Sequence, residues 1–261
     1  MQVFDKDNQD LVDDIQILAK ENSKGQVIIK YESEDNIIAY HNGIINVVAH
    51  ENAKLDIIIV NLTSDTSYNF LSIQNEIKEN AKVNYTIVDF GGKNSITNYY
   101  SNLIGTASKN NINVIYLGNN DQVFDLNYIA DLRGEKTDVN IEVQGALKDT
   151  AKKHFKGTID FKKGCKKAKG NENESCMLLS DKAKSLALPM LLCSEEDVEG
   201  NHSTSSGKVG NKELFYIMSR GFSKKEAEKL LVRAKFNKVL ENIKDEELKD
   251  QILNEIDKRL D

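Results

Sequence analysis

The stretch NAKLDIIIVNLTSDTSYNFLSIQNEIKENAKVNY, residues 52–85, contains one sequence pattern twice. Each copy begins with Asn-Ala-Lys at a polar turn and continues as an alternation of apolar and polar residues. Related copies begin near Asn110 and Thr137, so the pattern recurs about every 28 residues. A short strand that recurs at a constant period cannot bury its apolar face alone and must stack on its neighbours. The repeat therefore predicts a β-solenoid.

Other runs rich in β-branched and aromatic residues extend this pattern in both directions. Between the repeat copies lie Tyr68–Ile73, Ile96–Tyr100 and Phe124–Ile129, and before them lie residues 27–29, 36–40 and 44–48. No helical segment interrupts these runs, which favours stacked parallel rungs. A sandwich of antiparallel strands is the alternative interpretation of the same alternation. We place the solenoid core at residues 26–210.

The two ends of the chain carry helical patterns instead. Leu11, Val12, Ile15 and Leu18 have helical spacing and predict a short N-terminal helix within residues 1–25. Residues 211–261 predict a C-terminal helical subdomain, in which Ser223 and Glu226 have the spacing of a capping box. Its apolar stripes are Ala227, Leu230, Leu231 and Ala234, continued by Phe236, Val239, Leu240 and Ile243, and then Leu248, Ile252, Ile256 and Leu260. So small a helical unit is expected to dock on an end of the solenoid or on a partner.

Composition excludes several classes of protein. The chain has 261 residues, of which 39% are hydrophobic and 29% are charged, as in folded soluble proteins. No run of 18 apolar residues and no basic-then-apolar leader is present, so a cytoplasmic location is the expectation. The net charge of −6 gives no electrostatic reason to expect nucleic-acid binding.

The junction between the β and helical patterns, residues 177–221, contains the only proline and one of four histidines. Its distinctive residues are Leu178-Leu179-Ser180, Pro189, Asp197-Val198, His202, Gly207, Gly210, Glu213-Leu214-Phe215-Tyr216 and Ser219-Arg220-Gly221. In their order and spacing these residues resemble the core of the SufB/SufD family, the scaffold components of the SUF iron–sulfur cluster assembly machinery. Ser203, where SufB carries a glutamate, makes the junction locally nearer SufD.

The resemblance implies a complete expectation for fold and function. The fold would be mainly β, a right-handed parallel β-helix with a C-terminal α-helical subdomain and a short N-terminal helix. The protein would be a non-enzymatic scaffold that builds a transient iron–sulfur cluster at the interface with a second SufB/SufD-type subunit, in a homodimer or heterodimer. The resemblance implies a SufC-like ATPase as its partner. The chain itself has no Walker A motif, so ATP hydrolysis would have to come from that partner. No nucleic acid and no membrane are expected as partners.

Candidate cluster ligands follow from the same resemblance. His202 occupies the position of the histidine that SufB and SufD share in this motif. SufB carries a functional cysteine at the position of Glu174, so Cys176, two residues further on, is a candidate for a displaced role. Imidazole and thiolate both bind iron. The alternative for His202 is a turn histidine with structural hydrogen bonds.

The other two cysteines carry weaker expectations. Cys193 ends an apolar run and is a further candidate ligand, although buried packing is the commoner role there. Cys165 lies in a lysine-rich turn, where positive charge would lower its pKa and favour an exposed, reactive thiolate. The three cysteines have no CxxC spacing, which argues against a disulfide framework or a four-cysteine metal site in one chain.

The resemblance also assigns the docking of the ATPase to the C-terminal helices, with Leu214, Phe215, Tyr216 and Arg220 as the candidate partner-binding residues. Two functions of other classes remain open. One is a secreted-type carbohydrate-active β-helix enzyme, for which Asp56, Asp89 and Asp138 at outward positions are the available carboxylates. The other is a metal-free solenoid interaction module, which mutation of His202 and Cys176 would leave unaffected.

Overall fold

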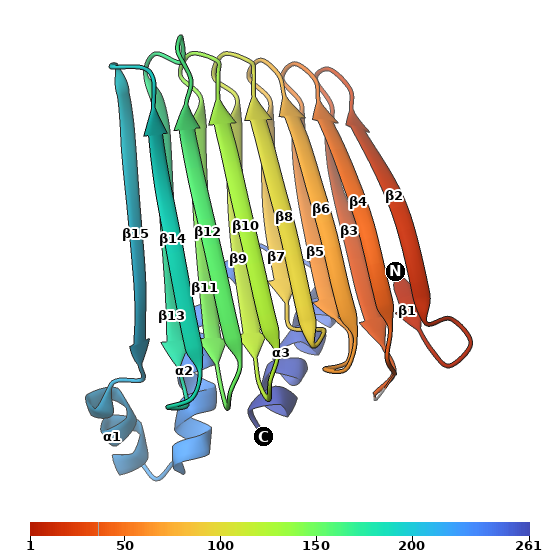
Figure 1. The fold of residues 1–261 in the computed structure, drawn as a ribbon, viewed down its shortest axis with the longest axis vertical. Coiled ribbons are helices and arrows are strands. Elements are labelled where there is room, and N and C mark those ends of the chain that lie inside the picture. The colour runs from red at the N-terminus through yellow and green to blue at the C-terminus, as the bar shows by residue number, and fades with distance from the viewer. Residues whose placement is uncertain (36) are drawn as a thin grey trace.

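The computed structural model describes residues 1–35 and 37–261, and its β part is a two-sided parallel solenoid (Figure 1). Every strand pairs in parallel with the strand one rung before or after it. This pairing confirms the solenoid and excludes the antiparallel sandwich. One sheet consists of β1 (Gln2–Phe4), β3 (Lys24–Ser33), β5 (Lys54–Leu62), β7 (Lys82–Asp89), β9 (Lys109–Gly118), β11 (Asp138–Leu147), β13 (Ala168–Leu178) and β15 (Val198–Lys208).

The opposite sheet is built from the alternate segments of the chain. It consists of β2 (Asp10–Ala19), β4 (Tyr40–Ala49), β6 (Tyr68–Ile77), β8 (Asn94–Leu103), β10 (Val123–Leu132), β12 (Lys152–Phe161) and β14 (Lys184–Cys193). Of the run predicted at residues 36–40, Asn36 lies outside the described residues, and Tyr40 begins β4.

The asparagine that opens the repeat pattern has a conformational role. Asn22, Asn52 and Asn80 occupy the same turn in successive rungs, each with a φ between 52° and 59°. Asparagine tolerates this left-handed conformation better than most residues because its short side chain bonds the local backbone. The Asn-Ala-Lys signature therefore marks the point where the chain crosses from one sheet to the other.

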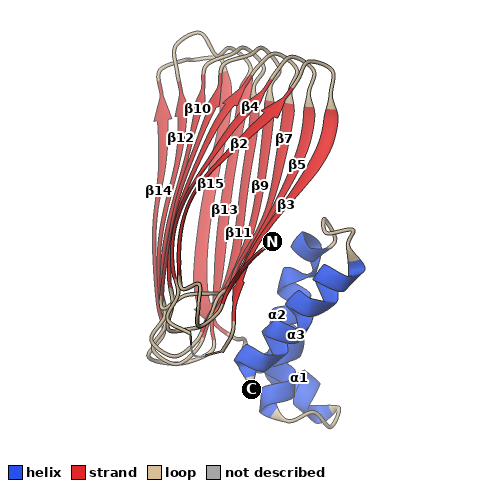
Figure 2. Cartoon of the chain, turned by 90° about the vertical axis from the view of Figure 1, so that its right-hand side faces the viewer, coloured by secondary structure: helices blue, strands red, loops and turns tan. Residues whose placement is uncertain are grey.

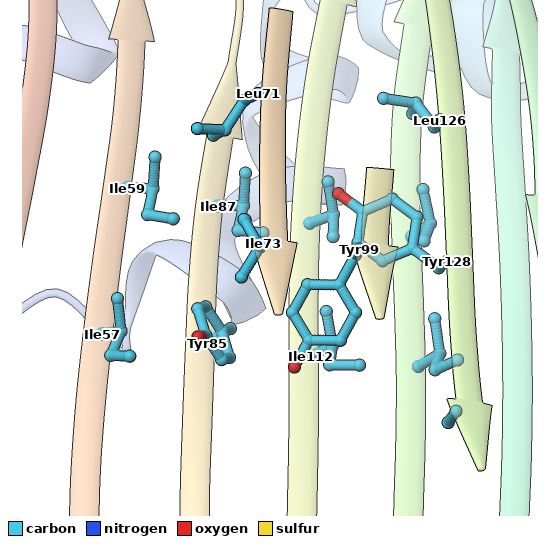
Figure 3. Close-up of a cluster of buried hydrophobic side chains, with 14 of the residues drawn as sticks. Ile57, Ile59, Leu71, Ile73, Tyr85, Ile87, Tyr99, Ile112, Leu126 and Tyr128 are labelled. Atoms are coloured by element: carbon cyan, nitrogen blue, oxygen red, sulfur yellow. The ribbon is translucent and has the colours of Figure 1, made fainter. Parts of the chain in front are cut away.

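The space between the sheets is filled by side chains that stack from rung to rung (Figure 3). Ile57, Ile73 and Ile112 are fully buried there. An aromatic column continues the stack, because the Tyr99 ring lies edge-on to Tyr85 and stacks on Tyr128 with centroids 5.4 Å apart. Such pairs stabilise beyond the area they bury.

The predicted N-terminal helix is wrong. Residues 10–19 form strand β2, which pairs along its whole length with β4. Leu11, Ile15 and Ile17 pack on the core, while Val12 and Leu18 point outward and are exposed. The apolar spacing of this segment fits a helix as well as a strand. Pairing with the next rung outweighs the weak stability of a short isolated helix. The solenoid therefore begins within residues 1–25.

Three helices follow the solenoid: α1 (Asn211–Ser219), α2 (Lys224–Leu240) and α3 (Glu246–Leu260). The capping box is present at the start of α2, where Ser223 and Glu226 exchange hydrogen bonds. The predicted stripe of α3 is buried as expected, and so are Phe236, Val239, Leu240 and Ile243. In the first half of α2 the prediction is only partly right, because Ala227 is buried but Leu230 is exposed, and Val232 is buried instead.

The helices do not cover an end of the solenoid, contrary to the expected docking. Helices α2 and α3 lie on the outer face of the eight-stranded sheet (Figure 2). Outward side chains such as Val60, Phe90 and Ile115 are apolar there and form a second core with α2 and α3. A strand that is apolar on both faces requires cover on both. Within the described residues no helix is long and apolar enough to cross a membrane.

Candidate functional site

Within the part of the chain that the structure describes, the last rung of the solenoid leaves two strand edges unpaired. Strands β14 and β15 each end their sheet and lie together at one end of the molecule (Figure 1). Every residue of β15 from Glu199 to Lys208 is exposed. Pro189 lies within β14, which is acceptable because an edge strand has one side without ladder hydrogen bonds. We name this open end, formed by β14 and β15, the mouth.

The outer face of β14 carries a row of large apolar side chains at the mouth. Its four members are each about half exposed: Leu186, Leu188, Met190 and Leu192. Exposed edge strands are ready templates for pairing with another chain, and natural proteins normally protect them with charge or cover. An apolar row on an unprotected edge indicates an interaction surface.

His202 lies in the middle of β15 and is exposed. It is therefore not a turn histidine, which was the alternative prediction from the sequence. It faces the solenoid interior, because a methyl group added to Gly200, two residues earlier, would contact the inward side chains of Leu191 and Phe161. In the parallel ladder, His202 pairs with Glu172 of β13. The mouth therefore places an imidazole directly beside a carboxyl group.

A buried polar cluster lies immediately below the mouth. Lys153 and Glu174 form an ion pair 2.7 Å long that is completely enclosed, and the Tyr116 hydroxyl donates to the same Glu174 oxygen at 3.2 Å. Cys176 faces inward from the same strand and is buried beside them. Burial raises the pKa of the Cys176 thiol, and Tyr116 and Lys153 oppose that shift.

Glu172 is a second carboxyl group in this interior. Burial, followed by the nearby charge of Glu174, raises the pKa of Glu172 to about 7. From the sequence, the basic run Lys152-Lys153-His154 is expected to be a solvated turn; this is wrong for Lys153, which is fully buried in β12. Sequence analysis did not single out Glu172. The signal that could have found both residues is a charged residue at an inward position of an alternating strand, since Gly170, Glu172, Glu174 and Cys176 all have the inward parity of β13.

Two cysteines lie in environments opposite to those predicted. Cys165 is buried in its turn, and burial, assisted by Glu195, raises its pKa to about 11. The expected lysine-activated thiolate is therefore wrong, because the neighbouring lysine chains extend outward. Cys193 was expected to pack in the core but is exposed, with its thiol donating to the Glu195 carbonyl at 2.9 Å.

The structure separates the three predicted ligands. Cys176 lies four residues along β13 from the position that pairs with His202, which corresponds to roughly 13 Å. Cys193 lies at the opposite end of β14 from Ser185, the residue beside Cys176, roughly 26 Å away. In the described part of the chain, no group of three or more His, Cys, Asp or Glu residues is placed to hold a metal ion. The roles of His202, Cys176 and Cys193 as ligands stay predictions.

The three aspartates of the carbohydrate-enzyme alternative do not converge. Asp89 is buried inside the solenoid rather than outward as predicted, with its carboxylate accepting hydrogen bonds from Asn61 and Ser95. Asp138 is the first residue of β11 and Asp56 the third of β5, and these strands lie three ladder steps apart, which already separates the two residues by roughly 14 Å. This separation exceeds what paired glycosidase carboxylates require.

Helix α1 presents the predicted partner-binding residues in two ways. Phe215 and Tyr216 are largely exposed, and the Arg220 guanidinium lies over the Tyr216 ring, 5.3 Å from its centroid. Leu214 is half-buried and lines a small cavity with Leu178 and Leu179. One face of the helix therefore packs on the molecule, and the other is open to solvent.

Sequence comparison adds to this geometry. The family model described as the SufBD core domain of SUF system FeS cluster assembly matches residues 3–235. The chain belongs to the SufBD family. The match includes nearly the whole solenoid of this SufBD chain, the mouth, α1 and most of α2.

Curated SufBD relatives include proteins named SufD, in agreement with the local likeness to SufD. The chain is 27% identical over 180 residues to the iron–sulfur cluster assembly protein SufD of Bacillus subtilis, which is 69% of this chain and 41% of that protein. It is 31% identical over 171 residues to a SufBD family protein of Pyrococcus horikoshii, 64% of this chain and 37% of the relative. The chain thus spans about two fifths of the length of these relatives.

Proposed function

We propose that this SufBD chain is a non-enzymatic scaffold for iron–sulfur cluster assembly, and that its mouth joins a second scaffold subunit at the place where the cluster is built. The observation that carries the proposal is the mouth itself, which combines unpaired strand edges, an exposed apolar row and the inward-facing His202. Iron and sulfide are the cargo of the site.

The second subunit is supported by the energetics of the edge. Covering the exposed halves of Leu186, Leu188, Met190 and Leu192 would contribute on the order of 4 kcal/mol in total. Pairing of the β14 or β15 edges would add backbone hydrogen bonds. Because one chain gathers no group of three ligands among its described residues, a cluster at the mouth needs ligands from both subunits.

An ATPase of the SufC type is the proposed partner of α1. Phe215 and Tyr216 form an exposed aromatic pair, the residue type most enriched in interface cores. ATP hydrolysis has to come from the partner, since the sequence has no Walker A motif.

The test combines assembly state and cluster formation. The chain is co-expressed with the ATPase, and anaerobic reconstitution with iron and sulfide is followed by visible absorbance and light scattering. We expect the wild type to form a dimer with a cluster, Leu188→Asp/Met190→Asp to be monomeric without one, and His202→Ala to dimerise without a cluster. His50→Ala, a histidine directly after β4 and several rungs away from the mouth, is the matched control and should behave as wild type.

Retention of the cluster by His202→Ala would refute the proposal, and so would a wild type that stays monomeric even when co-expressed with a second SufB/SufD-type subunit. Dimerisation and ATPase binding without a cluster in the wild type would instead favour the interaction module. Phe215→Ala/Tyr216→Ala should lose the ATPase in a pull-down while the dimer persists.

A further inference from the structure

Glu172 is a buried ionisable group with no hydrogen-bond partner among the described residues. Its side chain is 2% exposed, and neither carboxylate oxygen has a hydrogen-bond donor among the described residues. The nearby ammonium of Lys153 is already committed to Glu174 at 2.7 Å. The interior below the mouth therefore contains two carboxyl groups and one cation.

The Glu172 carboxylate occupies space that is open only because residue 157 is a glycine. A methyl group added to Gly157 of β12 would lie 2.2 Å from Glu172 Oε2. The carboxylate therefore reaches across the interior to the opposite sheet, into space that only glycine leaves open. Gly157 pairs with Pro189 of the edge strand β14, so this space lies one strand below the mouth on both sheets.

His202 completes the local arrangement. It pairs in register with Glu172 and has the same inward orientation, and neighbouring parallel strands lie about 4.8 Å apart. An imidazole nitrogen and a carboxylate oxygen on such neighbours can both reach one ion. Because β15 is the edge strand, the remaining coordination positions of that ion would open toward whatever covers the mouth.

A carboxylate without a hydrogen-bond donor is costly in a low-dielectric interior. Such a group either takes up a proton or is held beside a cation. The ligand chemistry indicates which cation: nitrogen with carboxylate oxygen suits divalent first-row transition metals, whereas calcium and magnesium prefer sites built from oxygen alone.

We propose that Glu172 and His202 form a two-ligand half-site at the mouth for a divalent transition metal, with iron(II) as the cargo ion and the remaining ligands supplied by a second subunit. The identity of the ion and the second subunit rest on the proposed scaffold function. The pairing of these two residues as ligands does not.

The experiment uses cobalt(II) alone as the probe, because its visible spectrum reports nitrogen and oxygen ligation without redox chemistry. The purified full chain is titrated anaerobically, together with Glu172→Gln, His202→Ala and Glu199→Gln. Glu199 is an exposed carboxylate of the same strand β15 that points outward to Lys169, and it serves as the matched control. We expect saturable cobalt binding by the wild type and Glu199→Gln, and at least tenfold weaker binding by the other two variants.

Thermal unfolding separates a ligand from a structural role. Because Glu172 makes no hydrogen bond within the described chain, metal-free Glu172→Gln should melt at or above the wild-type temperature. Cobalt should raise the melting temperature of the wild type but not of this variant. A structural role alone would lower the melting temperature and leave the cobalt spectrum intact.

Wild-type cobalt affinity in Glu172→Gln, or no saturable binding by the wild type, would overturn the inference. Either result leaves the scaffold function to its own reconstitution test. Conversely, cobalt binding that depends on both residues supports the half-site even where cluster reconstitution with the ATPase fails.

Discussion

Single polar side chains inside the solenoid determine how its interior responds to protonation. Asp89 is fully enclosed and accepts hydrogen bonds from Asn61 at 2.9 Å and from Ser95 at 2.8 Å. Burial is the largest influence and raises the pKa of Asp89 to about 6, against the smaller opposing effects of Ser95, Asn61 and Arg259. At a pH between 3.8 and about 6, Asp89 therefore carries a proton in the native state that it has lost in the unfolded chain.

The pH dependence of stability follows in sign from this shift. Between the ordinary pKa of 3.8 and about 6, the native state binds more protons than the unfolded state, so stability falls as pH rises. Relative to Asp89→Asn, the wild type should lose on the order of 2 kcal/mol of unfolding free energy between about pH 4 and pH 7. Urea unfolding at both pH values measures the difference. The exposed Asp121→Asn serves as control, and an identical difference there would contradict the assignment.

At the scale of the element, a large side chain on one strand is accommodated by a glycine at the paired position of the next strand. Gly145 of β11 pairs in register with Tyr116 of β9, and an added methyl group would lie 1.8 Å from the Tyr116 ring. Tyr116 in turn donates its hydroxyl to Glu174 at 3.2 Å. The glycine thus provides the space that lets the ring reach the polar cluster below the mouth.

Gly145→Ala should therefore destabilise the protein by about 2 kcal/mol or more, because a packed interior cannot accept an extra methyl group without strain. Gly25→Ala is the matched change in β3, where nothing lies within 4 Å of the added methyl group. We expect Gly25→Ala to raise the free energy of unfolding by about 0 to 1 kcal/mol. Chemical unfolding of both variants tests the pair, and equal effects would argue against the close packing of Tyr116.

At the scale of the whole molecule, two cores share one sheet. The interior core lies between the sheets, and the second core joins the outer face of the eight-stranded sheet to α2 and α3. Phe236 of α2 is fully buried in the second core and stacks on Phe90 with centroids 6.1 Å apart. Solenoid rungs draw their stability mainly from neighbouring rungs, so we expect the interior core to persist when the helices loosen.

Phe236→Ala should accordingly loosen the helices before the solenoid. Removing a buried phenylalanine costs about 3–5 kcal/mol, and that loss falls on the second core. Helical circular dichroism should disappear at lower urea than tyrosine fluorescence, which reports the buried Tyr85, Tyr99 and Tyr128 in a chain without tryptophan. Phe215→Ala, at an exposed position of α1, should change stability by less than about 0.5 kcal/mol. A single coincident transition in Phe236→Ala would show that both cores unfold together.

The parts of the fold that sequence predicted are those governed by local pattern. The 28-residue period, the capping box at Ser223 and the fourfold spacing of α3 each depend on residues close in the chain. Strand β2 was missed because its apolar spacing fits a helix as well as a strand. Cys165 and Cys193 were placed in the wrong environments, since burial at a turn or an edge depends on what the neighbouring rung covers.

The sequence by itself determined that this chain stacks short strands and ends in amphipathic helices, because periodicity and caps act over a few residues. Only the tertiary structure decided that His202 lies beside Glu172, that Cys176 and Cys193 lie far from both, and that the helices cover a side rather than an end. The physical reason is register. Parallel pairing joins residues about 30 positions apart, and a slip of a single residue would turn every inward side chain outward.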